Sequence, residues 1–180
     1  FECNSPGNAV NTNPIFKLPF GQIFVRAVCS SGVGALRGVI NSYIAVNKDR
    51  VGLNDGNKIA TDPDAQMALA LAVSTVDECE TIMFRNFDDM LEAARNDTSL
   101  PIEERIKMRF DASLVAGKCS DAINRMFIAC GAQGIYRDHP LNRAWLDINA
   151  GRQHVANNPF KFGRNVGGVM MGGENSDFFL

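Results

Sequence analysis

Four residues in the C-terminal third of the chain could do chemistry together if one helix carried them. They are spaced by four, four and three residues: Arg143, Asp147, Gly151 and His154. This spacing places them on one helical face. A glycine inside a helix costs about 1 kcal/mol relative to alanine, and the usual compensation is that another group approaches the backbone there. The imidazole beyond that gap could therefore face a flat ligand lying against the helix.

The same face also has a structural interpretation. Gly151 could admit a neighbouring helix, and Asp147 could pair with Arg143 at the surface. A histidine near a helix C-terminus is also favoured by the helix dipole when it is protonated. The spacing by itself leaves both interpretations open.

A glycine-containing connector, residues 130–136 (CGAQGIY), precedes this face. Backbone amides beside the start of a helix suit oxygen-rich anions such as phosphates. Most loops of this composition are simply turns, so the pattern is a weak indication of a binding site.

Prolines divide the chain into the helices that would position these groups, because proline is favoured in a first helical turn and disfavoured inside a helix. We predict four long helices, at about residues 20–48, 62–94, 99–131 and 138–159, with Asp62, Ser99 and Asp138 as candidate N-caps. Long helices with short connections favour antiparallel neighbours. The sequence therefore predicts an all-α fold, an up-down four-helix bundle.

Small residues form a ridge on two of these helices. The first ridge is Ala27, Ser31, Gly34 and Gly38, and the second is Ser113, Gly117, Ser120 and Asn124. We expect the first to allow close packing of another helix, and the second either to do the same or to line a site.

Both ends of the chain are predicted to be irregular. Residues 1–18 lack helical periodicity and are interpreted as the remnant of a preceding domain, while residues 19–180 form the helical domain. The glycine-rich stretch 160–180 predicts a short helical turn near residues 165–171 and an end that docks on a neighbour. Because the sequence does not begin with methionine, we expect a fragment or a processed product.

Composition narrows the function classes. Of 180 residues, 46% are apolar, and a net charge of −2 gives no electrostatic reason to expect nucleic acid or an anionic membrane as partner. No signal peptide and no uninterrupted apolar run of membrane-spanning length is visible. The five cysteines lack CxxC spacing and predict neither a metal site nor disulfides, but buried thiols in a reducing, cytoplasmic protein: Cys3, Cys29, Cys79, Cys119 and Cys130.

The connector and the following segment, residues 131–136 (GAQGIY) and 139–147 (HPLNRAWLD), resemble a junction in the C-terminal helical domain of the acyl-CoA dehydrogenase fold. The chain is more specifically similar to flavin-dependent two-component monooxygenases on that fold, such as the oxygenase component of 4-hydroxyphenylacetate 3-hydroxylase. The resemblance covers nearly all of the chain from Pro19 onward.

Two departures from the family pattern matter. Acyl-CoA dehydrogenases carry a catalytic glutamate where this chain has residues 153–156 (QHVA), so the resemblance points away from proton abstraction from an acyl-CoA. The family's N-terminal helical domain and central β-domain have no counterpart in these 180 residues. We therefore expect this chain to carry only part of an active site.

The resemblance implies a flavoprotein oxidoreductase that hydroxylates an aromatic or phenolic compound. A separate flavin reductase would supply FMNH2 or FADH2, O2 would add to the flavin as a hydroperoxide, and the terminal oxygen would pass to the substrate. The family also implies a cytoplasmic homotetramer without a metal. Alternatives are an N-hydroxylating, desulfurising or dehydrogenase relative on the same fold, and a non-catalytic helical assembly module.

The resemblance assigns roles to particular residues. His154 matches a histidine beside the reactive edge of the flavin, where an imidazole side chain suits proton transfer near neutral pH. Arg50 matches an arginine that meets the flavin phosphate, often across a subunit boundary; the alternative is a solvated surface arginine. The flavin-contacting junction is matched by Gly131, Ala132, Gln133 and Gly134.

Phe20 and Phe24 lie where the family places aromatic substrate contacts, and core packing is the alternative interpretation. Arg143 and Asp147 are interpreted as a structural pair.

Overall fold

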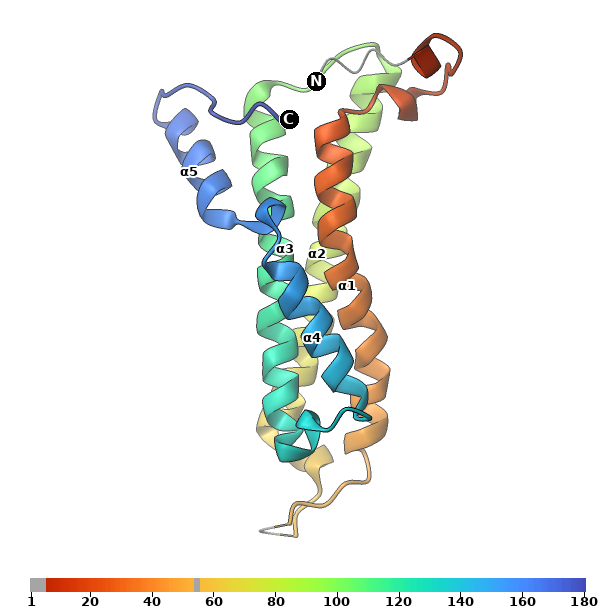
Figure 1. Cartoon of the computed structure of the whole chain (residues 1–180), viewed down its shortest axis with the longest axis vertical. Coiled ribbons are helices and arrows are strands. Elements are labelled where there is room, and N and C mark those ends of the chain that lie inside the picture. Colours follow the sequence, from red (N-terminus) through yellow and green to blue (C-terminus); the bar gives the residue numbers. More distant parts are fainter. Residues whose placement is uncertain (1–5, 54–55) are drawn as a thin grey trace.

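A computed structural model of the chain describes residues 6–53 and 56–180, and in these residues every regular element is helical. Three long helices run side by side: α1 (Phe20–Asn47), α2 (Pro63–Arg95) and α3 (Ile102–Ala129). The shorter α4 (Pro140–Arg152) lies across α1 and α3, and α5 (Pro159–Met170) is set to one side near the end of the bundle where the chain finishes (Figure 1). The predicted all-α bundle is confirmed, with a fifth helix added.

Short 3-10 turns connect or flank the helices: η1 (Pro6–Ala9), η2 (Pro14–Lys17), η3 (Ile59–Thr61), η4 (Gly131–Ile135) and η5 (Val155–Asn157). The loop between α1 and α2 adds an isolated antiparallel bridge between Val51 and Lys58.

The helix starts follow the prolines, but only one of the three predicted caps is confirmed. Asp62 caps α2, because its Oδ1 accepts a hydrogen bond of 2.8 Å from the amide of Ala65. The prediction for Ser99 is wrong, since α3 begins at Ile102 after Pro101 and has no side-chain cap.

The cap predicted at Asp138 is also wrong. His139 takes this place, with Nδ1 accepting from the amide of Leu141 at 3.3 Å. A histidine nitrogen can fill the role because it is neutral when it accepts.

Helix α5 is longer than the predicted turn near residues 165–171. Asn158 starts it, because its Oδ1 accepts from the amides of Phe160 (3.1 Å) and Lys161 (3.3 Å) and Pro159 follows in the first turn. Three glycines lower the helix propensity of this segment, so the full length of the helix could not be predicted from the sequence. Gly163 is needed for packing, since a Cβ there would lie 2.9 Å from the ring of Phe110.

Helix α3 is the centre of the molecule and contacts each of the other four α-helices. The main core draws large side chains from α1, α3 and α4, among them Leu36, Tyr43, Ile123, Met126, Leu141 and Ile148, and smaller ones from α2, such as Ala72 and Val76. The cysteines join this core as free, buried thiols, as predicted, at Cys29, Cys79, Cys119 and Cys130. Cys3 lies outside the described residues.

The two small-residue ridges have different outcomes. The first ridge does not pack inside the chain: Ala27, Ser31, Gly34 and Gly38 are all exposed on α1. The second ridge lies under α4, where the Ser120 hydroxyl donates to Oδ1 of Asn149 at 2.9 Å. The expectation that another helix covers the second ridge is therefore confirmed for Ser120 and Asn124, whereas a Cβ at Gly117 would meet nothing within 4 Å.

The N-terminal segment packs on the bundle. Leu18 is buried against Met90, Ala94 and Met108, where α2 and α3 meet. Its origin in a preceding domain stays a prediction.

The last residues return to the same end of the bundle (Figure 1), where the carbonyl of Leu180 accepts a hydrogen bond of 2.8 Å from Arg105. In this structure the end packs on its own chain, and docking on a neighbour stays a prediction.

Helix α1 is long and apolar enough to cross a membrane by length and composition, as the core helices of many bundles are. In this structure it packs against α2, α3 and α4 and buries Gln22 and Arg26. These contacts describe a core helix.

Candidate functional site

His154 lies beyond the helix that was predicted to carry it. Helix α4 ends at Arg152, and His154 has extended backbone angles (φ −65°, ψ 138°) as the N-cap of η5. The predicted shared face with Arg143 and Asp147 is therefore wrong. The side chain of Asn157 ends α4 by donating to the carbonyl of Gly151 at 2.8 Å.

The imidazole of His154 is oriented by the backbone of η5. Its Nδ1 accepts a hydrogen bond of 3.1 Å from the amide of Ala156, while its own amide donates to the carbonyl of Gly151 at 3.2 Å. Because Nδ1 is the acceptor, the neutral ring carries its proton on Nε2. The side chain is exposed, so this proton is available to a ligand.

Aromatic side chains stand beside this histidine. The ring centroids of Phe24 and His154 are 6.4 Å apart, and Phe179 packs edge-on against Phe24 at 5.6 Å and against Phe20 at 5.9 Å. We call Phe20, Phe24 and Phe179 the aromatic wall. Phe20 is 49% exposed and Phe24 is 39% exposed, so the interpretation of these two residues as core packing is wrong.

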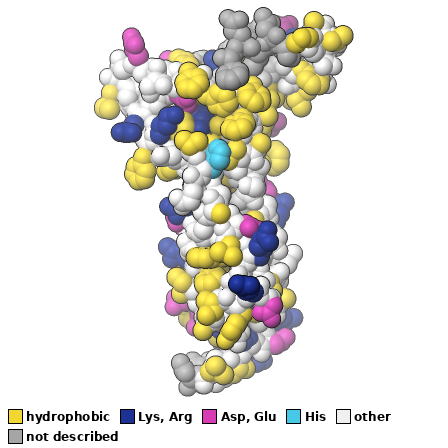
Figure 2. Space-filling view, in the orientation of Figure 1, with side chains coloured by type: hydrophobic (Ala, Val, Ile, Leu, Met, Phe, Trp, Pro, Cys, Tyr) yellow, Lys and Arg dark blue, Asp and Glu magenta, His cyan; other side chains and the backbone are white. Residues whose placement is uncertain are grey.

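Figure 2 shows hydrophobic side chains gathered beside a histidine at this end of the bundle. An exposed aromatic cluster at a domain surface commonly marks a binding surface. The sequence had indicated Phe20 and Phe24 through the family resemblance, but nothing in it placed Phe179 against them.

The connector forms η4 and turns sharply at Gly131, whose φ of +63° favours glycine. Gly131, Ala132 and Gln133 are exposed, whereas Gly134 is buried against the ring of Phe127. The amide of Asn142 in α4 donates to the carbonyls of Gly134 and Ile135, at 3.2 Å each. The start of α4 therefore holds the connector in place.

Arg50 lies against this connector. Its Nη2 is 3.7 Å from the position of a Cβ on Gly131, and its Nη1 donates to Oδ1 of Asn47 at 3.0 Å. Nδ2 of Asn47 in turn donates a hydrogen bond of 3.6 Å to Sγ of Cys130. Arg50 is thus half-buried and held by hydrogen bonds, which corrects the interpretation as a freely solvated arginine.

The charge of Arg50 also acts on His139. Burial and, secondly, the nearby Arg50 guanidinium lower the pKa of His139 below its ordinary value of 6.5, although Asp138 opposes the shift. The guanidinium of Arg50 is thus close enough to disfavour the protonated form of His139.

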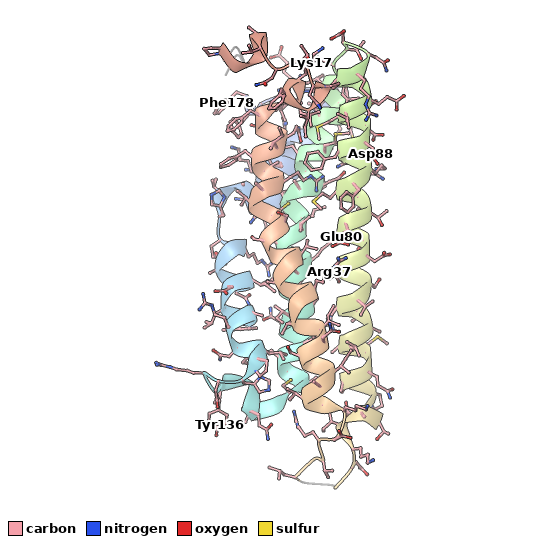
Figure 3. The ribbon with its side chains drawn as sticks, turned by 90° about the vertical axis from the view of Figure 1, so that its right-hand side faces the viewer. Lys17, Arg37, Glu80, Asp88, Tyr136 and Phe178 are labelled. Carbon is pink, nitrogen blue, oxygen red and sulfur yellow. The ribbon has the colours of Figure 1, made fainter. Side chains whose placement is uncertain are left out.

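The structure does not bring the two groups of predicted flavin contacts together. The connector precedes α4 and His154 follows it, so the 13 residues of the helix separate them by roughly 20 Å at 1.5 Å per residue. Figure 3 shows Tyr136, at the end of the connector, and Phe178, beside the aromatic wall, far apart along the bundle. The two groups of predicted flavin contacts therefore lie at opposite ends of α4, and the role of each residue stays a prediction.

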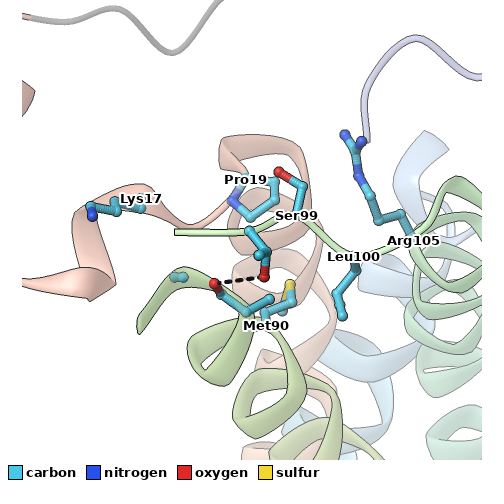
Figure 4. Close-up of a pocket in the computed structure, with 9 residues that line it drawn as sticks. Lys17, Pro19, Met90, Ser99, Leu100 and Arg105 are labelled. Atoms are coloured by element: carbon cyan, nitrogen blue, oxygen red, sulfur yellow. Dashed lines mark hydrogen bonds between the residues drawn. The ribbon is translucent and has the colours of Figure 1, made fainter. Parts of the chain in front are cut away.

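The pockets that we describe are small. A cavity of about 150 Å³ lies below Gly151, between α1, α3 and α4, and is lined largely by small side chains such as Ser31, Gly32 and Ala35. A second, of about 90 Å³, lies between Pro19, Met90 and Arg105 (Figure 4). Pockets for drug-sized ligands are typically about 300–1,000 Å³, so neither could enclose a flavin.

A metal centre has no support in the described residues, where no three His, Cys, Asp or Glu side chains form a group that could hold an ion.

Comparisons with known proteins give the class to which this arrangement belongs. Residues 27–159 match the family described as "Acyl-CoA dehydrogenase, C-terminal domain". The chain therefore belongs to that family.

The sequence is also similar to individual proteins of known name. The chain is 30% identical over 156 residues to "Flavin-dependent monooxygenase, oxygenase subunit HsaA" of Rhodococcus jostii, an alignment covering 86% of this chain and 41% of the relative. It is 26% identical over 170 residues to the "FADH(2)-dependent resorcinol hydroxylase, oxygenase component" of Rhizobium sp., covering 88% and 41%. This chain thus spans about two fifths of the length of these relatives.

Solved structures agree with the fold. The 3-HSA hydroxylase from Rhodococcus sp. superimposes with a TM-score of 0.88 at 28% identity, over 97% of this chain and 45% of that one. XiaF from Streptomyces, solved with FADH2 and glycerol, has a TM-score of 0.83 at 19% identity, over 96% and 44%. The latter likeness shows the fold alone.

Proposed function

We propose that this chain is the C-terminal helical domain of the oxygenase component of a reduced-flavin-dependent monooxygenase, acting on an aromatic or phenolic compound. One observation carries the proposal: the imidazole of His154, oriented by the amide of Ala156, is exposed beside the aromatic wall. The relatives support it, because matched relatives are named as oxygenase subunits or components.

The residues of this chain fit two parts of a flavin nucleotide. Arg50 beside the exposed connector offers a fixed guanidinium and backbone amides, a donor set suited to phosphate. His154 offers one polar atom to the flavin ring, and the aromatic wall beside it offers an apolar surface for the ring of a substrate. FMN and FAD both present a phosphate and a flat ring, so the fit does not choose between them.

Because α4 separates these two surfaces, we propose that they serve two different flavin molecules in a homo-oligomer, a tetramer by family likeness. Arg50 and the connector of one copy would hold the phosphate of one flavin, and His154 of the same copy would face another. The exposed ridge Ala27, Ser31, Gly34 and Gly38 supports close packing between copies.

The bound reduced flavin supplies, with O2, the oxygen atom that the substrate receives. With Nδ1 accepting from the amide of Ala156, His154 can donate a hydrogen bond from Nε2–H to an oxygen of the bound flavin or of the phenolic substrate. Accepting a proton from a phenolic hydroxyl at Nε2 would require the proton to move to Nδ1 and the bond from Ala156 to break. The aromatic wall packs against the substrate ring and keeps water from the reacting atoms. A separate flavin reductase, delivering the reduced cofactor, is the partner that this activity requires.

The test uses the full-length protein with a flavin reductase, a nicotinamide donor and a panel of phenols, amines and organosulfur compounds. Oxygen uptake with a hydroxylated phenol as product supports the proposal. A product from the amines or the sulfur compounds alone would replace it with a relative of different substrate class. Oxygen uptake no faster than that of free reduced flavin would overturn it in favour of a helical assembly module.

A further inference from the structure

Arg109 of α3 is a buried charged residue that links three separate segments. Its Nη1 donates to the carbonyl of Ala156 in η5 at 3.0 Å, and its guanidinium carbon lies 3.5 Å from the ring centre of Phe162 in α5. Its Nε lies 3.8 Å from Oδ2 of Asp177 in the C-terminal segment, and both side chains are only 4% exposed. Burial lowers the pKa of Arg109 to about 10, although Asp177 opposes the shift.

Asp177 fixes the C-terminal segment, residues 175–180. Its Oδ1 accepts from the amide of Phe179 at 3.1 Å, and this hydrogen bond orients the backbone that carries the Phe179 ring. Asn165 of α5 holds the preceding turn by accepting from the amide of Ser176 at 2.8 Å and donating to Asn175 at 2.8 Å.

The segment also needs Gly21 of α1. A Cβ at Gly21 would lie 2.6 Å from the carbonyl oxygen of Phe179, closer than real contacts allow. The backbone of the C-terminal segment therefore rests directly on α1, below Phe20 and Phe24.

Two chains of contacts lead from this ion pair to His154. In the first, Arg109 holds Ala156, whose amide holds Nδ1 of His154. In the second, Asp177 holds Phe179, which packs on Phe24, whose ring faces His154. Displacing either charged partner would therefore act on both the imidazole and the aromatic wall.

We propose that the Arg109–Asp177 pair positions His154 and Phe179 relative to each other, so that the C-terminal segment sets the geometry of the catalytic surface. This inference rests on the proposed function for its consequence in catalysis. Arg109 and Asp177 are positioning residues, because they act through Ala156 and Phe179.

A role in stability alone explains the pair less well. At 3.8 Å the Nε of Arg109 and the Oδ2 of Asp177 are too far apart for a hydrogen bond, and neither atom has another hydrogen-bond partner among the described residues. Buried pairs with such incomplete bonding stabilise little, since desolvation offsets the attraction. Through its contacts with Ala156, Phe162 and Asp177, Arg109 instead holds η5, α5 and the C-terminal segment in one arrangement.

Hydrogen–deuterium exchange in the flavin-free, full-length protein tests the first chain of contacts. Asp177→Asn removes the charge and keeps an oxygen for the amide of Phe179. We expect the amide of Ala156, in another segment of the chain, to exchange about tenfold faster as η5 opens more often. Asp97→Asn is the matched control, because Asp97 pairs with Lys17 at the exposed surface, and it should leave that rate unchanged.

Gly21→Ala tests the second chain without touching either charge. The added Cβ pushes the C-terminal segment off α1 and withdraws Asp177 from Arg109, so the same amide should exchange faster. In turnover, both Asp177→Asn and Gly21→Ala should lower kcat and product formed per O2 about tenfold to a hundredfold. The Kd for flavin should change much less than kcat, because Arg50 and the connector, which would hold the phosphate, are at the other end of α4.

Unchanged exchange at Ala156 in folded Asp177→Asn or Gly21→Ala protein overturns the inference. So does a loss of flavin affinity that matches the loss of kcat, since that outcome describes general damage to the fold. If one variant does not fold, the exchange rate of the Ala156 amide in the other variant is the test. A full-length protein that uses no oxygen but shows the faster exchange keeps the structural coupling and removes the proposed function instead.

Discussion

Nη2 of Arg50 lies 3.7 Å from the place that a Cβ on Gly131 would occupy, so the first loop of the bundle touches the connector before α4. These residues are 81 positions apart in the sequence. Their contact gives one end of the molecule a fixed positive charge beside a turn with a positive φ. The first prediction follows from this charge.

Arg50→Gln should weaken flavin binding to the full-length protein by about tenfold or more, because a hydrogen bond to a charged group contributes roughly 1.5–3 kcal/mol. The Kd is measured by fluorescence titration of the flavin. Arg37→Gln is the matched control, since Arg37 pairs with Glu80 between α1 and α2, away from the connector (Figure 3). Equal affinities for the two variants would remove Arg50 from the binding site.

Phe24→Ala should raise the KM for the aromatic substrate by roughly two- to tenfold, because an aromatic pair contributes about 0.5–1.5 kcal/mol beyond its buried area. Steady-state kinetics with the best substrate of the panel measures the change. Phe84→Ala provides the comparison, since Phe84 is 59% exposed on α2. The same KM in both variants would mean that the aromatic wall does not contact the substrate.

Stability should decrease as the pH falls below about 6.5, the ordinary pKa of the unfolded histidine. The pKa of His139 is lowered in the folded protein, so the unfolded chain binds the proton more readily and acid favours unfolding. Protonation also removes the acceptor that caps α4. The contribution is fully present above pH 6.5 and is lost on the way down to the folded pKa.

Urea unfolding at pH 7.5 and pH 5.5 checks this dependence. His139→Asn keeps an acceptor at the N-cap without a titrating group, so its loss of stability between the two pH values should be smaller than that of the natural sequence. Equal losses would show that other groups cause the pH dependence.

Leu36→Ala should reduce the free energy of unfolding by about 2–5 kcal/mol, since it removes a fully buried side chain and leaves a cavity. Leu36 is 0% exposed at the centre of the main core, whereas Leu53 is 99% exposed. Leu53→Ala should change the stability by less than about 0.5 kcal/mol. Similar effects of the two substitutions would contradict the position given to α1 in the core.

Much of the fold follows from local rules. Pro63 and Pro140 mark helix starts because the fixed φ of proline suits a first turn, and Asp62 caps its helix through a hydrogen bond three residues ahead. Apolar spacing then identifies the buried faces of long helices. These signals act within a few residues, so the sequence displays them directly.

The errors arise where side chains compete with the backbone or where distant segments meet. His154 leaves the predicted helix because Asn157 binds the carbonyl of Gly151 and Asn158 starts α5. Helix periodicity contains no information about this competition.

The candidate site was predictable only in part. His154, Arg50 and the connector came from a family resemblance, which carries no distances between them. Arg109 and Asp177 could not be found, because their contact joins α3 to the end of the chain, 68 residues later. Nothing in the local sequence of either residue indicates a buried pair.

The most direct test of the account replaces the histidine itself. His154→Asn in the full-length protein keeps an acceptor for the amide of Ala156 but removes the atom that carries the proton. The measurement is hydroxylated product formed per O2 consumed, with hydrogen peroxide determined in the same reaction, and Gln153→Asn is the neighbouring control. The account predicts continued oxygen use with peroxide in place of most of the product, whereas an unchanged yield of product per O2 would contradict it.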